Sequence, residues 1–193
     1  MKSNLLAIFV SSLIALTSDK TFEERLRLSL NNVECHFIQI SDSPIFGISK
    51  EKGQIFIGKG GQFRMDYDSG ISLFCDGSNV IQYDRSTRTA TRSTISDNVK
   101  AHKLWMIFST DEPYISAQAT QISPNVYSVE GFGARPEKTS VQFTFENSDL
   151  VSIQWVPNSG GTQLLHFTQI KSLQSGSRKK LSLVLPGNTR WSK

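Results

Sequence analysis

This sequence of 193 residues is poor in the residues from which catalytic and metal sites are usually built. Two cysteines exclude a disulfide-dense scaffold, and three isolated histidines argue against a zinc cluster. The sequence contains no Gly-x-Ser-x-Gly elbow and no His-Glu-x-x-His helix motif, which are signatures of two large hydrolase classes. We therefore expect no catalytic residue, no metal and no cofactor. An exported hydrolase that uses His36, His102 or His166 remains an alternative.

Charge is also scarce and evenly spread. The 21 lysines and arginines exceed the 17 acidic residues by only +4, without the basic stripe that a nucleic-acid partner requires. The tract from Gly53 to Gly60 has the glycine and lysine spacing of a phosphate-binding loop. Gly60 stands where the magnesium-binding Ser or Thr belongs, and Gln54–Ile57 is typical of a strand. The pattern therefore argues against nucleotide binding.

After the first residues the chain lacks any long hydrophobic run. The apolar stretch Leu5–Leu16 is too short to span a bilayer as a helix, and it follows Lys2 and precedes small residues. This order predicts a secretory signal peptide over residues 1–18, and the remaining residues 19–193 are expected to form a single domain. The alternatives for the first segment are an uncleaved anchor and a buried helix.

The mature chain begins with a pattern typical of a helix, after which the spacing of its apolar residues changes to the alternation typical of strands. Thr21–Glu24 is a capping-box pattern, and it predicts a short helix that ends at Asn31-Asn32. Alternating apolar residues then predict strands, and Asp76-Gly77 is typical of a hairpin turn. The expected strands are 35–40, 54–57, 62–68, 71–75, 80–83, 115–119, 126–131, 139–145, 150–155, 163–170 and 181–185. This pattern predicts a mainly β (α+β) fold, with a curved antiparallel sheet or barrel and a helical plug or lid.

The helical interruption is expected over residues 97–108. Its dense apolar cluster Leu104–Phe108 is the obvious cover for a sheet that carries many Phe, Ile, Leu and Met side chains. We hypothesise that Phe63, Met65 and residues 105–108 line an apolar cavity; the alternative for each is an ordinary packed core. Whether Cys35 and Cys75 form a disulfide or remain free thiols is left open by the sequence.

Several motifs together resemble one known family. They are Gly53–Ile57, Lys59, Phe63–Tyr67, Asp76-Gly77 and Gln82–Asp84. In this combination the chain resembles the periplasmic outer-membrane lipoprotein carrier proteins of the LolA family. The resemblance covers residues 33–94 well and is weaker at 104–108 and 183–187.

The resemblance implies an unclosed antiparallel β-barrel with a helical lid, in a periplasmic chaperone that shields lipoprotein acyl chains. It also implies delivery of lipoproteins from an inner-membrane ABC transporter to an outer-membrane receptor, without catalysis and with the carrier as a monomer. An outer-membrane acceptor and an envelope-stress sensor domain are alternatives within the superfamily. The expected lining of the acyl-chain cavity is Phe37, Phe56, Phe63, Met65, Phe74, Trp105, Met106, Phe108, Phe143 and Phe145.

One departure from the family concerns the lid. The family has an Arg-Pro pair where this chain has Lys59-Gly60, and the arginine tethers the lid through hydrogen bonds. Lys59 is therefore the expected lid anchor. A lysine keeps the positive charge but lacks the planar fork of a guanidinium, so we expect a weaker closed state.

Overall fold

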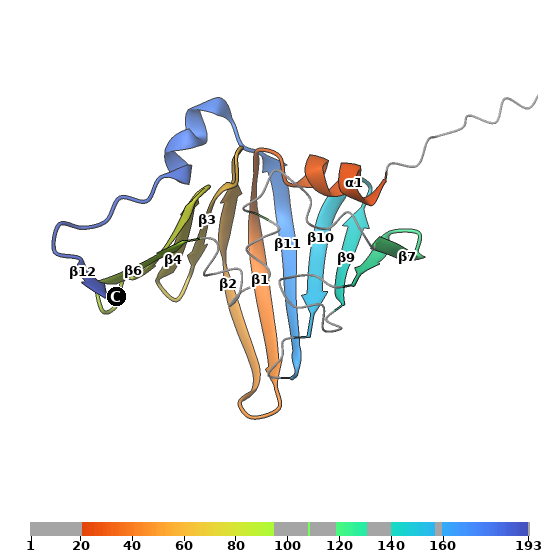
Figure 1. Cartoon of the computed structure of the whole chain (residues 1–193), viewed down its shortest axis with the longest axis horizontal. Coiled ribbons are helices and arrows are strands. Elements are labelled where there is room, and N and C mark those ends of the chain that lie inside the picture. The colour runs from red at the N-terminus through yellow and green to blue at the C-terminus, as the bar shows by residue number, and fades with distance from the viewer. Residues whose placement is uncertain (1–20, 95–107, 109–118, 131–139, 157–159, 193) are drawn as a thin grey trace, which may run out of the picture.

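The computed structural model describes residues 21–94, 108, 119–130, 140–156 and 160–192 (Figure 1). Besides the single helical residue Phe108, this part of the chain contains two helices, α1 (Phe22–Ser29) and the 3₁₀ helix η1 (Ser175–Leu181). The strands are β1 (Val33–Ser43), β2 (Gly47–Ile57), β3 (Gln62–Tyr67), β4 (Ile71–Asp76), β5 (Asn79–Asp84), β6 (Thr89–Thr94), β7 (Ala119–Ser123), β8 (Val126–Val129), β9 (Val141–Glu146), β10 (Asp149–Trp155), β11 (Thr162–Ser172) and β12 (Arg190–Ser192).

Helix α1 starts where its cap predicts. The Thr21 hydroxyl accepts a hydrogen bond from the Glu24 amide at 3.3 Å, and the Glu24 carboxylate accepts one from the Thr21 amide at 3.2 Å. These two bonds satisfy amides that have no partner within the helix. Phe22 and Leu26 lie four residues apart and are both buried, so α1 packs one apolar stripe against the sheet.

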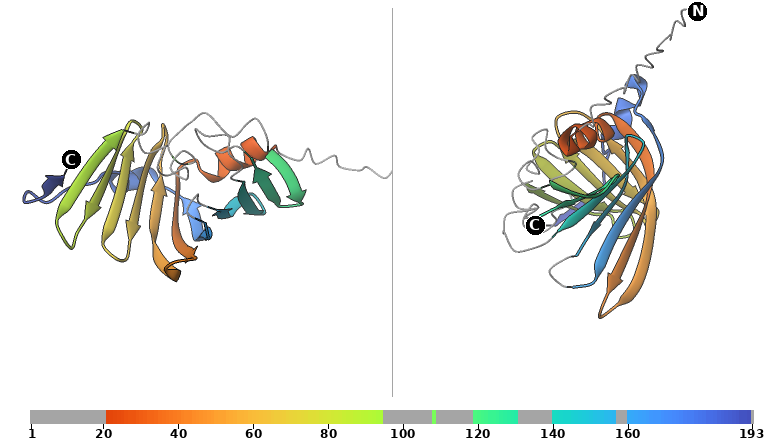
Figure 2. Two further views of the ribbon diagram at one scale, coloured as in Figure 1. Left: turned by 60° about the horizontal axis from the view of Figure 1, so that its bottom comes forward. Right: turned by 90° about the vertical axis from the view of Figure 1, so that its right-hand side faces the viewer.

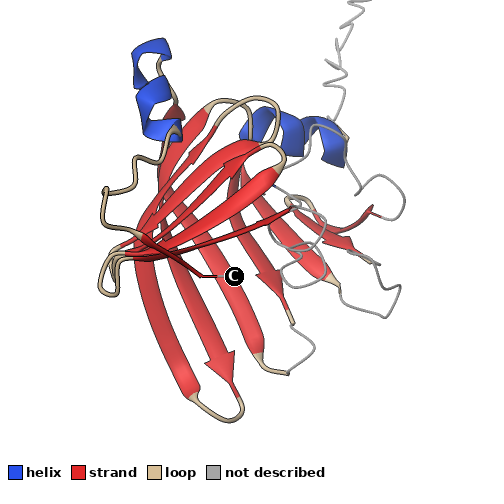
Figure 3. Cartoon of the chain, turned by 60° about the vertical axis from the view of Figure 1, so that its left-hand side comes forward, coloured by secondary structure: helices blue, strands red, loops and turns tan. Residues whose placement is uncertain are grey.

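All strands of the described residues form one sheet, in the order β12-β6-β5-β4-β3-β2-β1-β11-β10-β9-β8-β7. Every pairing is antiparallel except that of β12 with β6. The strands at the two ends of this order, β12 and β7, are not paired with each other, so the sheet is curved but does not close (Figures 2 and 3). This confirms the predicted mainly β, unclosed and curved architecture.

The chain after β11 crosses the convex side of the sheet. Strand β11 lies beside β1 in the middle of the sheet, whereas β12 pairs with β6 at its edge. The segment that connects β11 to β12 is held on the sheet by a hydrogen bond, in which Arg64 Nη1 on β3 donates to the Ser182 carbonyl at 2.8 Å. The predicted strand over residues 181–185 is wrong, because this segment lies across the strands instead of beside one and has no ladder to join.

Other differences concern polar strands. Strand β6 was not predicted, because Thr89–Thr94 is polar apart from one alanine and has no apolar alternation. Strands β1 and β2 both extend beyond their predicted ends, and they pair with each other as far as Ser43 and Gly47. The predicted hairpin of β4 and β5 around Asp76-Gly77 is confirmed.

Candidate functional site

The candidate site is the concave face of the sheet, which the strand register fills with apolar side chains. Directly paired residues point to the same face. One row runs across four strands through Cys35, Ile55, Met65 and Leu73. The adjacent row joins Ile57 on β2 to Phe63 on β3 and Cys75 on β4. All of these side chains are buried.

A glycine shapes the centre of this face. Gly53 is paired with Phe37 on one side and Tyr67 on the other, so the three lie in one row. A Cβ atom on Gly53 would lie 2.8 Å from Phe37 Cζ and would collide with the Asp66 carbonyl. Because Gly53 has no side chain, the Phe37 and Tyr67 rings meet over it, with centroids 5.0 Å apart and an edge-on angle of 78°.

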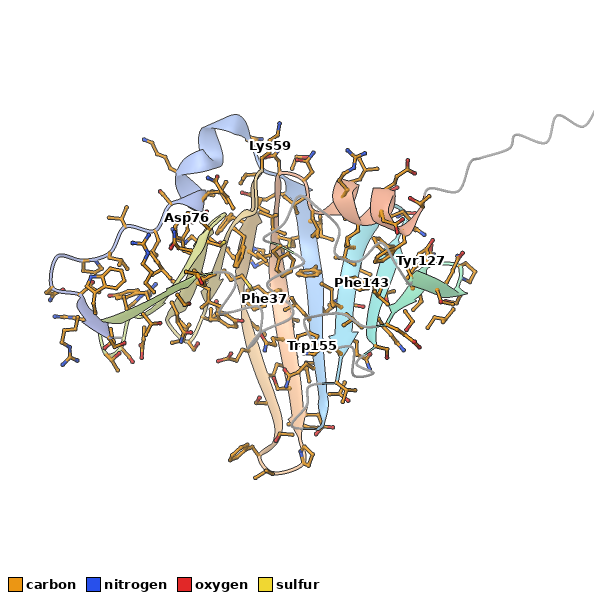
Figure 4. All side chains as sticks on the ribbon, in the orientation of Figure 1. Phe37, Lys59, Asp76, Tyr127, Phe143 and Trp155 are labelled. Carbon is orange, nitrogen blue, oxygen red and sulfur yellow. The ribbon has the colours of Figure 1, made fainter. Side chains whose placement is uncertain are left out.

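The other half of the face is aromatic and is covered by α1. Its central row joins Tyr127 on β8, Phe143 on β9 and Ile153 on β10. The Phe22 ring of α1 lies 5.3 Å from Tyr127 and 5.2 Å from Phe143, and Figure 4 shows both sheet residues beside α1. Phe145 belongs to the same cluster, at 6.2 Å from Phe22. Helix α1 therefore forms a fixed cover at this end.

Phe108 covers the middle of the face. Its ring centroid lies 6.0 Å from Phe63 on β3 and 6.3 Å from Phe167 on β11, although β2 and β1 separate those two strands. It is helical and only 4% exposed. Phe108 belongs to the predicted lid cluster, whereas Trp105 and Met106 lie outside the described residues.

The buried cysteine and tyrosine side chains of this face are held in their neutral forms. Burial raises the pKa of the Cys35 thiol to about 12 and also raises the pKa of Cys75. Burial, with a smaller contribution from the Glu51 charge, raises the pKa of Tyr67 to about 12, and its hydroxyl donates to Gln39 Oε1 at 2.9 Å. Thiols held protonated are poor nucleophiles, so this environment suits apolar contact and not covalent chemistry.

The two cysteines are free. Cys35 lies on β1 and Cys75 on β4, with β2 and β3 between them. Three strand spacings amount to about 14 Å, twice the Cα separation that a disulfide allows. The structure therefore decides the question that the sequence left open.

The predicted cavity residues divide between the two faces of the sheet. Phe37, Phe63, Met65, Phe143 and Phe145 are buried on the concave face. The register places Phe56 and Phe74 on the convex face, because each is paired directly with Arg64. These two residues do not belong to the concave set.

Phe56 is buried by the C-terminal segment instead. The Lys180 ammonium lies 5.4 Å from the centre of its ring and also binds the Glu34 carboxylate at 2.7 Å. A second lysine, Lys171, lies 3.0 Å from the other carboxylate oxygen. The hydrogen bonds from Lys180 and then Lys171 lower the pKa of Glu34 below its ordinary value of 4.5.

The expected lid anchor, Lys59, lies in the exposed turn between β2 and β3 (Figure 4). No hydrogen bond or ion pair of its ammonium to another described residue is present. The segment that it would hold lies mostly outside the described residues, so its role stays a prediction.

Sequence reasoning missed Tyr127 and Phe167 of the concave face and Phe22 of the helix that covers it. The apolar alternation of Leu165 and Phe167 was a usable signal for β11. Phe22 lies on a helix, and no local pattern indicates which strands a helix covers. Tyr127 lies in a four-residue strand, too short to show a clear period.

Other kinds of site find little support in the described part of the chain. It contains no group of three or more His, Cys, Asp or Glu side chains arranged to hold a metal ion. Neither of its helices has the length and apolar character needed to cross a bilayer.

Several solved structures are similar to this chain at low sequence identity. An uncharacterised conserved protein from Thermus thermophilus matches with a TM-score of 0.50 and 9% identity, covering 88% of this chain and 94% of that chain. A LolA superfamily protein from Nitrosomonas europaea has a TM-score of 0.48 and 9% identity, with 83% and 95% covered. A putative outer membrane lipoprotein-sorting protein domain from Vibrio parahaemolyticus has a TM-score of 0.47 and 8% identity, with 82% and 96% covered.

No curated protein is significantly similar to the chain in sequence. The family model for the outer membrane lipoprotein carrier protein LolA, however, matches residues 29–183. That match extends from the end of α1 past η1 and includes every strand of the sheet except β12. The chain therefore belongs to the LolA family.

Proposed function

We propose that this protein is a periplasmic carrier that holds lipoprotein acyl chains against its concave face. In this role it takes lipoproteins from an inner-membrane releasing transporter and delivers them to an outer-membrane receptor. The observation that carries the proposal is the continuous apolar concave face with Phe108 lying across its middle. Membership of a family of lipoprotein carriers supports it.

The energetics of an acyl chain suit such a face. A sixteen-carbon chain costs roughly 12 kcal/mol when exposed to water, at about 0.8 kcal/mol per CH₂. The rows around Ile55, Met65 and Phe63 offer apolar contact without a charged group among them. Because Phe108 already contacts this face, an acyl chain that displaces it gains only the difference between the two burials. That difference keeps binding weak enough for release.

The proposed contact set follows the register. It consists of Phe37, Phe63 and Met65, which an acyl chain contacts when it displaces Phe108, while Phe143 and Phe145 line the end of the face that α1 covers. Trp105 and Met106 remain predicted members, and Lys59 the predicted lid anchor. Phe56 and Phe74 are left out because they face the convex side.

Binding of a synthetic triacylated lipopeptide tests the proposal, with the same peptide without acyl chains as the matched control. A ligand at a hundred times its Kd stabilises the folded state by about 2.7 kcal/mol. For a chain of this size we expect the melting temperature to rise by about 5–10 °C with the acylated peptide only.

Two results would contradict the carrier function. The first is equal melting temperatures with the acylated and the control peptide at saturating concentrations. The second is the appearance of free fatty acid and deacylated peptide in a mass spectrum after incubation, which would identify a hydrolase.

A further inference from the structure

We propose that the tip of the β1–β2 hairpin, formed by Ile45, Phe46 and Ile48, is a membrane-contact site that enters the headgroup–acyl boundary of a phospholipid bilayer. The proposal concerns a surface outside the concave face. It does not depend on what the concave face binds.

Among the described residues, the tip carries the most solvent-exposed group of large apolar side chains on one turn. Phe46 is 88% exposed, Ile45 80% and Ile48 75%. None of the three belongs to the apolar core, so folding of the described residues gains nothing from them. Three such side chains together in water are unfavourable, and they indicate a surface that is covered in use.

The hairpin projects beyond its neighbours. Strand β3 stops pairing with β2 at Gly53 and Tyr67, whereas β1 and β2 remain paired as far as Ser43 and Gly47. In Figure 1 the hairpin extends below the rest of the sheet. Of the described residues at this end, those of the tip can therefore touch a flat surface first.

The turn has a defined conformation. The Ser43 hydroxyl accepts hydrogen bonds from the Ile45 and Phe46 amides, each at 3.3 Å. Gly47 has a positive φ of 72°, which a glycine adopts without strain. Gly161 packs against the strand that leads into the turn, where a Cβ atom would collide with the Asp42 carbonyl. The apolar side chains are thus presented on a supported turn.

The shape of the tip favours a bilayer over a protein partner. A stable protein interface buries about 800 Å² on each partner, more than three side chains at a convex tip can supply. A fluid bilayer accommodates a convex apolar wedge, as it does the apolar face of an interfacial helix.

The charges behind the tip fit the same orientation. Lys50 and Lys52 follow Ile48 on the same face of β2, where their ammonium groups can reach headgroup phosphates. Asp42 and Glu51 on the hairpin offset these two charges. Insertion of the apolar side chains is therefore the main source of affinity, and anionic lipid strengthens it only modestly.

Sedimentation of the protein with vesicles of phosphatidylcholine and phosphatidylglycerol tests the proposal. The variant Ile45→Ser/Phe46→Ser/Ile48→Ser removes the apolar tip without touching the core. Val184→Ser is the matched control, because Val184 is 87% exposed on the C-terminal segment. We expect the triple variant to lose vesicle binding by about tenfold or more, and the control to bind as the unchanged protein does.

A second measurement locates the contact directly. Tryptophan placed at the tip by Phe46→Trp should shift its emission to shorter wavelength when vesicles are added, whereas Val184→Trp should not. Equal vesicle binding by the triple variant, or an equal emission shift at both positions, would overturn the proposal. So would size-exclusion chromatography showing a dimer that only the triple variant loses, since the tip would then bind a second copy.

Discussion

At the scale of single residues, Gly53 decides how the centre of the concave face is packed. Its position between Phe37 and Tyr67 leaves a gap that the two rings fill. The sequence shows Gly53 only as part of a loop-like glycine pattern. The register of β2 with two neighbours explains why a side chain does not fit there.

Substitution of Gly53 by alanine should therefore destabilise the fold although alanine is the smallest possible change. The added Cβ must displace the Phe37 ring and the backbone at Asp66, and we expect a loss of about 1–3 kcal/mol in the free energy of unfolding. Urea denaturation measures it. The control Gln54→Ala changes an exposed neighbour on the same strand and should shift the midpoint far less; equal shifts would contradict the packing argument.

At the scale of elements, the two covers of the concave face differ in kind. Helix α1 is capped by Thr21 and is also held by Arg25, whose guanidinium donates to the Tyr127 hydroxyl at 3.3 Å and lies 4.8 Å from the centre of the Phe145 ring. Phe108 comes from the segment that the sequence predicts as a lid. Under the proposed function, only the cover at Phe108 is displaced by an acyl chain.

Phe108→Ala and Phe22→Ala form a matched pair, since both rings are 4% exposed and both pack on aromatic side chains. Each substitution should lower the free energy of unfolding by about 3–5 kcal/mol. Only Phe108→Ala should also tighten binding of the triacylated lipopeptide, because the acyl chain then has less to displace. Titration calorimetry measures the affinities. Unchanged or weaker binding by Phe108→Ala would assign Phe108 to a fixed core.

At the scale of the whole molecule, the C-terminal segment links the middle of the sheet to its edge. It leaves β11, crosses the convex face at Arg64 and Glu34, and ends by pairing β12 with β6. This crossing buries Phe56 and closes the convex side over β2. The ion pair of Glu34 with Lys180 is the charged part of this attachment.

The substitution Glu34→Gln should therefore make the free energy of unfolding depend less on pH in the acid range. Because the pKa of Glu34 is lowered in the folded state, its contribution is present at pH values above about 5 and is lost as the pH falls through the folded pKa. We expect the variant to be about 1 kcal/mol less stable at pH 7 and to converge with the unchanged protein as the pH falls below the folded pKa of Glu34. Urea midpoints across this range measure the difference. A constant difference at all pH values would show that the charge of Glu34 is not involved.

The sequence by itself determined the elements whose signals are local. The Thr21–Glu24 cap places α1, strict alternation identifies Phe63 and Met65 as residues of one face, and Asp76-Gly77 places the β4–β5 hairpin. The motifs between Gly53 and Asp84 also indicated the family that the match over residues 29–183 shows. These local patterns predict structure correctly because a helix cap, a strand pleat and a tight turn depend only on neighbouring residues.

Only the tertiary structure decided which face each apolar residue occupies and what covers it. Ile55, Phe56 and Ile57 form one apolar run, and such a run does not reveal that Phe56 points away from the other two. The run is apolar on both faces of β2 because the C-terminal segment, more than a hundred residues later in the chain, covers the convex face. The separation of Cys35 from Cys75 and the pairing of polar β6 with β12 depend in the same way on contacts between distant segments, which no local pattern encodes.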